Sequence, residues 1–190
     1  MIADIAQSIR DIVRVAMGMP TDSVRPANQL AGAGTQVQHL ATVEIIRTTD
    51  LGWPAITTEN VDDTDASPVI ENVDQLKQVV ASVNFYRGGN ADAAGIAGWT
   101  LRAVDDAARV GQRMAMGATF DLIRSLGLAF IDASDARDLT ALENGLWKSR
   151  GQVDLTFNVV NRESSQIPTV GSGSVGLTVD SKTKTIEVQS

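Results

Sequence analysis

Two hydrophobic patterns divide the chain into predicted helices and strands. At the start, apolar residues recur at spacings of three and four, which predicts an amphipathic helix over residues 2–17, ended by Gly18 and Pro20. Further on, apolar and polar residues alternate, which is typical of half-buried strands. The alternation predicts four strands, over residues 37–48, 75–86, 128–131 and 152–162.

Helical spacing returns between the second and third of these strands. It predicts one helix over residues 90–109, with Asn90 as its N-cap, and another over residues 113–126 that ends at Gly127. Strands that arrive in adjacent pairs favour antiparallel or mixed pairing. We therefore predict an α+β fold of two layers, a sheet of about four strands packed on helices. One core should be shared by strands and helices through Val83, Phe85, Leu155, Phe157 and Val159.

Two segments do not belong to the predicted two-layer fold. Residues 49–74 are polar, and from residue 57 onward they carry six acids and no basic residue, so we expect a long acidic loop. Residues 164–174 are rich in glycine and serine and precede a predicted β-hairpin with arms 175–179 and 185–188. The predicted organisation is thus an α+β domain over 1–163 and a tether with a C-terminal hairpin over 164–190.

Both segments contain residues that suit contacts with a partner. Apolar residues in a polar loop, or on an isolated hairpin, need a surface to cover them. The interface candidates are Trp53, Ile56, Asp62, Asp63, Asp65, Leu177, Val179, Ile186 and Val188. Trp99, in the small-residue part of the predicted helix 90–109, suits core burial and subunit contact equally well.

Composition removes several classes of function. The 190 residues contain no cysteine and one histidine, which excludes disulfide scaffolds, thiolate metal sites and cysteine nucleophiles. No apolar run approaches the ~18 residues of a membrane span. The net charge of −7 argues against tight binding to nucleic-acid phosphates. Residues 1–5 lack the basic start of a signal peptide, so we expect synthesis in a cytoplasm.

Enzyme signatures are weak. Residues 171–176 match GxGxxG, but a strand pattern follows where a dinucleotide fold needs a helix, so a flexible linker is the better interpretation. His39 is in phase with apolar positions, which indicates a core or interface imidazole. Asp132, Asp135 and Asp138 do not have calcium-loop spacing and indicate a solvated connector. We predict no catalytic residue, no cofactor and no metal site.

The order of several short motifs resembles a known family. A strand closes and a small-residue helix opens at Phe85-Tyr86-Arg87-Gly88-Gly89-Asn90-Ala91, and a later helix ends in Leu126-Gly127-Leu128. Residues 138–143, a Trp147-Lys148-Ser149-Arg150 element and the strand 152–157 follow. This succession resembles the neck or tail-terminator proteins of tailed bacteriophages over roughly residues 37–163.

The resemblance implies a structural function. Such proteins form a ring, here expected to contain six copies, that caps the tail tube and joins it to the head–tail connector. The partners would be further copies of the chain, the tail tube protein and the connector, with genomic DNA passing through the lumen without sequence-specific binding and no membrane contact. The protein would lie in the neck of the virion. The residues read as fold-defining are Phe85, Tyr86, Gly88, Asn90, Leu139, Leu142, Trp147, Arg150 and Phe157.

Other functions stay open at this point. The protein could instead be another head–tail connector or adaptor component, or a tail-tube-like protein, because these are also small α+β proteins that form rings. A cytoplasmic enzyme and a monomeric binding module are more remote alternatives. The acidic charge suits a channel for DNA, because like charges would repel the phosphates and let the genome slide.

Overall fold

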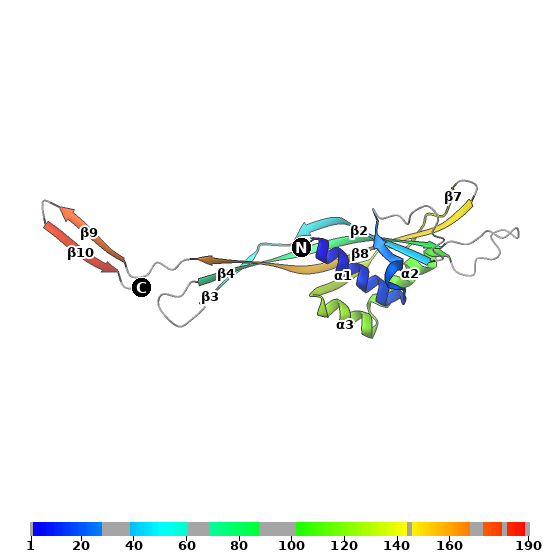
Figure 1. Cartoon of the computed structure of the whole chain (residues 1–190), viewed down its shortest axis with the longest axis horizontal. Helices are drawn as coiled ribbons and strands as arrows, with labels where there is room; N and C mark the ends of the chain where they lie inside the picture. The colour runs from blue at the N-terminus through cyan, green and yellow to red at the C-terminus, as the bar shows by residue number, and fades with distance from the viewer. Residues whose placement is uncertain are drawn as a thin grey trace. The chain divides into compact units, whose positions relative to one another are not determined.

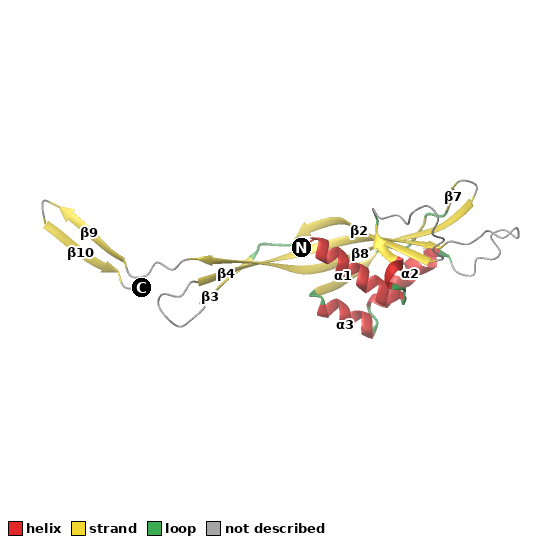
Figure 2. Cartoon of the chain, viewed as in Figure 1, coloured by secondary structure: helices red, strands yellow, loops and turns green. Residues whose placement is uncertain are grey.

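The computed structural model describes residues 2–27, 39–60, 69–87, 102–143, 146–167, 173–179 and 182–188. These residues contain three α-helices and one short 3-10 helix (Figures 1 and 2). The helices are α1 (Ile2–Met17), η1 (Thr21–Ser23), α2 (Ala103–Met114) and α3 (Gly117–Ser125).

The strands form one mixed sheet and one separate hairpin. Their bounds are β1 (Val24–Pro26), β2 (His39–Asp50), β3 (Ala55–Asn60), β4 (Val69–Arg87), β5 (Leu128–Ala133), β6 (Arg137–Asp138), β7 (Ala141–Glu143), β8 (Leu146–Ile167), β9 (Gly173–Val179) and β10 (Lys182–Val188). The main path runs β1-β2-β4-β8-β5, while β3 pairs with β4, and β6 and β7 pair with β8. The pairing is parallel between β1 and β2 and antiparallel between β2 and β4.

The chain divides into two compact units. We call Met1–Leu51 with Leu76–Val160 the body unit, and Gly52–Gln75 with Asn161–Ser190 the strand unit. The body unit contains all three described α-helices, which lie on one side of its sheet (Figure 1).

The core of the body unit lies between the helices and one face of the sheet. Strand alternation directs Val83 and Phe85 of β4, and Leu155 and Phe157 of β8, toward the helices, and all four are fully buried. Val159 is partly buried against the same cluster. The predicted shared core is therefore confirmed. The helices contribute Ile9, Ile12, Val13, Ala107, Val110, Met114 and Ile123.

Local contacts explain where the helices begin and end. Gly18, which follows α1, has a φ of 62°, a conformation that favours glycine, and Arg113 of α2 donates to the Ala16 carbonyl in the last turn of α1 at 2.9 Å. At the start of α2, the Asp105 carboxylate accepts from the Arg102 backbone N–H, and the Ala103 N–H donates to Ser149 Oγ of β8 at 3.0 Å. These bonds satisfy backbone groups that helix ends leave unpaired.

Three of the predicted elements need correction. Most of the described part of 49–74 forms strands, because β3 pairs with the start of β4, whereas we expected an acidic loop. The described helix begins at Ala103 and runs through Gly111 to Met114, although we expected a helix over 90–109; residues 88–101 lie outside the described residues. The tether expected over 164–174 is also wrong in part, because β8 continues to Ile167.

The α+β class is confirmed, but a sheet of about four strands is too small. Residues 132–144, expected to be a connector, contribute the short strands β6 and β7, and β1 adds a parallel edge. The C-terminal hairpin is present as antiparallel β9 and β10, with longer arms than we expected. Gly173 and Ser174, expected in the tether, belong to β9.

Candidate functional site

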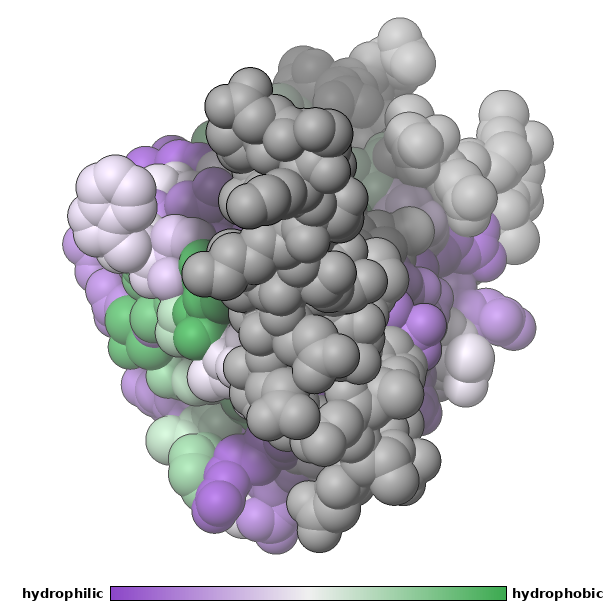
Figure 3. Space-filling model, turned by 90° about the vertical axis from the view of Figure 1, so that its left-hand side faces the viewer, coloured by the Kyte–Doolittle hydropathy of each residue, from purple (hydrophilic) through white to green (hydrophobic). Residues whose placement is uncertain are grey.

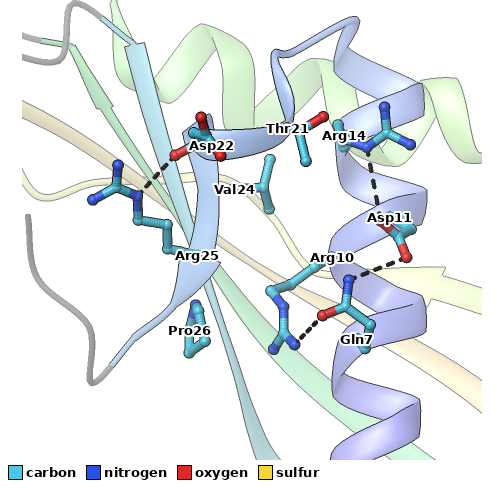
Figure 4. A pocket seen from close by; sticks show the side chains of 9 residues that line it. All are labelled: Gln7, Arg10, Asp11, Arg14, Thr21, Asp22, Val24, Arg25 and Pro26. Carbon is cyan, nitrogen blue, oxygen red and sulfur yellow. Dashed lines mark hydrogen bonds and ion pairs between the residues drawn. The ribbon is translucent and has the colours of Figure 1, made fainter.

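A polar groove lies between α1 and the edge strand β1 (Figure 4). Its volume is about 520 Å³. Helix α1 presents one long polar face to it, and η1 and β1 form the opposite wall. The lining residues are Gln7, Arg10, Asp11, Arg14, Thr21, Asp22, Val24, Arg25 and Pro26.

The groove carries three guanidinium groups and two carboxylates. Arg10 donates to Gln7 Oε1, Gln7 donates to Asp11 at 3.2 Å, and Arg14 Nε lies 3.7 Å from Asp11. On the opposite wall, Arg25 Nε donates to the Asp22 backbone carbonyl at 2.8 Å. The groove is therefore net positive in a chain whose net charge is −7.

A buried carboxylate joins α2 to two strands elsewhere in the body unit. Asp106 of α2 is 2% exposed and accepts two hydrogen bonds from Arg87 of β4, at 2.6 and 2.9 Å. His39 of β2 places its Nε2 3.1 Å from the same carboxylate. Burial alone would raise the pKa of Asp106, but the hydrogen bonds and charges of His39 and Arg87 outweigh it and lower the pKa to about 2.

This cluster was not predicted from the sequence, which gave only a core or interface role for His39. Its three members lie on separate elements, and Arg87 and Asp106 are 19 positions apart. The only local signal is an acidic residue in the first turn of a helix, which helix-end electrostatics explains by itself.

The sheet of the strand unit has little cover. In this sheet β3 pairs with the start of β4. Two side-chain contacts join the start of β4 to the end of β8: Arg162 makes a bidentate pair with Asp74 at 2.7 Å, and Ser164 donates to Asn72 at 2.6 Å. The hydrogen bond from Arg162 lowers the pKa of Asp74. Within its described residues this unit contains no helix.

Large apolar side chains are exposed in the strand unit. Trp53 is 96% exposed and Ile56 is 61% exposed. On the face drawn in Figure 3, hydrophobic and hydrophilic surface lie side by side in the coloured part of the molecule. Trp53 lies between β2 and β3, and Ile56 lies on β3. Exposed apolar patches mark protein contact surfaces, so these two side chains are the candidates for such a contact.

Comparison with known proteins decides the family. The chain matches the phage neck terminator protein family over residues 3–182. It is a member of the phage neck terminator family. No curated protein matches the chain. The family assignment makes the chain a structural virion component that associates with other phage head or tail proteins.

Several residues suggested by the resemblance lie together in this neck terminator. Arg150 donates two hydrogen bonds to Asn84 Oδ1, and its guanidinium lies 5.6 Å from the ring centroid of Tyr86. The Leu139 N–H donates to the Arg150 carbonyl. Leu142 and Trp147 are register partners in the β7–β8 ladder, and Phe85 and Phe157 lie in the core.

The remaining fold-defining and interface candidates lie either outside the described residues or in the C-terminal hairpin. Gly88, Asn90, Trp99, Asp62, Asp63 and Asp65 lie outside the described residues. Leu177 and Val179 belong to β9, and Ile186 and Val188 belong to β10. Of the interface candidates whose side chains the structure describes, Trp53 and Ile56 both belong to the strand unit.

The described residues offer neither a candidate metal site nor a candidate membrane-spanning helix. Among the described residues, no group of three or more acidic or histidine side chains could hold a metal ion. Asp138, one of the three connector aspartates, accepts from the Thr140 N–H, and its Thr140 hydrogen bonds lower its pKa. In the described part of the chain, no helix is long and apolar enough to cross a membrane.

Proposed function

We propose that this neck terminator assembles into a closed ring of six copies that caps the tail tube and joins it to the head–tail connector. The family assignment supports the location and the structural role. What we propose beyond the family is that the protein forms a ring, that the ring has six copies, and that its neighbours are the tail tube and the connector. Genomic DNA would pass through the lumen, where the net charge of −7 disfavours binding to phosphates.

The exposure of Trp53 carries this proposal. A tryptophan that is 96% exposed, beside an isoleucine that is 61% exposed, leaves a large apolar area in water. Buried tryptophans are among the strongest contributors to protein–protein contacts. The described part of the strand unit contains strands and no helix, and such a sheet gains stability when another protein packs on it. Both features suit a subunit whose final environment is an assembly.

The first test is the native mass of the purified protein, combined with electron microscopy. We expect a closed ring of six copies. An open fibre would support the tail-tube-like alternative, and a monomer that associates only with other neck proteins would support the adaptor alternative.

The second test removes the exposed apolar side chains. Trp53→Ala with Ile56→Ser should weaken assembly by at least about tenfold, because truncating an interface anchor costs on the order of 2 kcal/mol. The matched control is Phe120→Ser, since Phe120 is a 47% exposed aromatic residue on α3 of the body unit. Equal assembly of wild type and the Trp53 variant, by analytical ultracentrifugation, would contradict this contact surface.

A further inference from the structure

We infer that the groove between α1 and β1 binds the acidic segment of a second copy of this chain. The segment is residues 57–65, with the sequence Thr-Thr-Glu-Asn-Val-Asp-Asp-Thr-Asp. This inference rests on the proposed ring and names one of its contacts. Residues 61–68 lie outside the described residues, so the sequence alone supplies their charge.

Charge is the first argument. Arg10, Arg14 and Arg25 line the groove, and each is half-buried. Residues 57–74 of the chain contain six acids and no base, so they are its most acidic stretch. Opposite charges on two surfaces steer association and fix which surfaces meet.

The shape of the groove is the second argument. Strand β1 is the last strand at its end of the main path and lines the groove. Among the described strands it pairs only with β2, so its other backbone edge has no described ladder. Figure 4 shows Arg10 reaching from α1 into the space between the helix and β1. A space between a helix and a free sheet edge accepts an extended segment, which adds backbone hydrogen bonds at the edge.

The hydrogen bonds among the groove's own side chains order its polar surface before a segment binds. Gln7 holds both Arg10 and Asp11, so the polar face of α1 is already ordered. Ordered side chains lose less conformational entropy on binding. The two carboxylates, Asp11 and Asp22, limit where a further acid can lie and so favour one register.

The direct test uses a synthetic peptide of residues 57–74 and the full chain. We expect the peptide to bind, by fluorescence anisotropy, and to lose affinity as salt is raised. Arg10→Glu with Arg14→Glu should weaken binding by at least about tenfold because like charges then face each other. Arg47→Glu with Arg109→Glu makes the same charge change at two exposed arginines outside the groove, and should leave binding unchanged.

The Glu variants need a folding control, because Arg14 also lies near Asp11 within α1. Far-UV circular dichroism and the melting temperature check the fold, and Arg10→Gln with Arg14→Gln removes the charge without reversing it. The Gln pair should weaken peptide binding less than the Glu pair does. Equal binding by wild type and a folded Gln or Glu variant overturns the inference.

A charge exchange tests whether the contact joins two copies. Asp62→Lys with Asp63→Lys should block assembly, as should the Arg10/Arg14 reversal. A mixture of these two variants should assemble, because each reversed surface then meets its complement on the other chain. Recovery only when all four changes are in one chain would place the contact within a single copy and overturn the inference.

The outcomes also separate this inference from the proposed ring. If wild type forms the ring and the groove variants form it equally well, the groove contact is wrong and the ring stands. If wild type is a monomer, the ring is wrong, while peptide binding still tests the groove. Tighter binding of a short DNA duplex than of the peptide, lost in the groove variant, would identify phosphates as the occupant and overturn the inference.

Discussion

Asp106 is the residue whose environment departs most from an ordinary surface carboxylate. It is 2% exposed, and it holds Arg87 by two hydrogen bonds and lies 3.1 Å from His39 Nε2. A buried charge is tolerated when partners of opposite charge satisfy it. The cluster therefore fixes the start of α2 to strands β2 and β4.

The first residue-scale prediction concerns pH. The pKa of Asp106 is lowered from 3.8 to about 2 in the folded state, so its contribution to stability is fully present above the unfolded value. It is lost as the pH falls through about 2. Asp106→Asn should lower the free energy of unfolding by about 2 kcal/mol at neutral pH, and by less below pH ~3.

Urea unfolding of wild type and variant between pH 2 and pH 7 measures this difference. Asp121→Asn, at an exposed position on α3, is the matched control and should show a small, pH-independent change. A difference between wild type and Asp106→Asn that stays constant down to pH 2 would contradict the assigned contacts.

The second residue-scale prediction concerns Gly151 of β8. A Cβ added there would lie 2.4 Å from the Ala103 carbonyl oxygen, at the start of α2. Backbone atoms cannot move away cheaply, so Gly151→Ala should destabilise the body unit by roughly 1–3 kcal/mol. Gly117→Ala is the control, because nothing lies within 4 Å of its added Cβ. Thermal melting compares the two, and equal melting temperatures would show that this packing is looser than described.

At the scale of elements, hydrophobic periodicity predicted correctly those helices and strands whose own sequence has a regular apolar pattern. Helix α1 has the predicted bounds, because its apolar stripe is regular and Gly18 ends it. The core faces of β4 and β8 were also predicted, since strict alternation fixes which residues turn inward. The two-layer α+β arrangement follows from these elements.

Elements that depend on distant pairing were not predicted. Strand β3 consists of Ala-Ile-Thr-Thr-Glu-Asn, which has no apolar alternation, and its strand conformation comes from its ladder with β4. The ends of β8 were missed for the same reason, because Ser164 and its neighbours are polar and Ser164 bonds to Asn72 across the sheet. Local composition suggested loops where the backbone pairing of another strand decides the structure.

The candidate site also has a part that the sequence predicted and a part that it did not. The exposed Trp53 and Ile56 were singled out from composition, as apolar residues in a polar segment. The groove between α1 and β1 was not found, because its arginines lie on two elements that only the fold brings together. The sequence also carries no signal for the parallel pairing of β1 with β2, which creates the groove's second wall.

At the scale of the whole molecule, the C-terminal hairpin is the part whose stability most requires a partner. A two-stranded hairpin is marginally stable by itself in water. The register pairs Val175 with Ile186 and Gly173 with Val188. Strand alternation adds Leu177 and Val179 to the same set of positions, together with their register partners Lys184 and Lys182. The positions of the opposite face are polar residues or glycine: Ser174, Gly176, Thr178, Thr183, Thr185 and Glu187.

Because the large apolar residues all fall in one set of positions, the last prediction is that the hairpin docks on a neighbouring protein in the neck through that set. Leu177→Ser with Ile186→Ser should leave the melting temperature of the subunit unchanged and weaken ring assembly or joining to the other neck proteins. Thr178→Ala with Thr185→Ala, on the opposite face, is the control and should assemble as wild type does.

Deletion of residues 168–190 is the stronger form of the same test. A docked hairpin predicts a folded subunit that no longer assembles or joins, as judged by sedimentation and by reconstitution of virions. A hairpin that instead packs on its own subunit contributes to that subunit's core. Its deletion would then lower the melting temperature, and this result, or normal assembly of the truncated chain, would contradict docking on a neighbour.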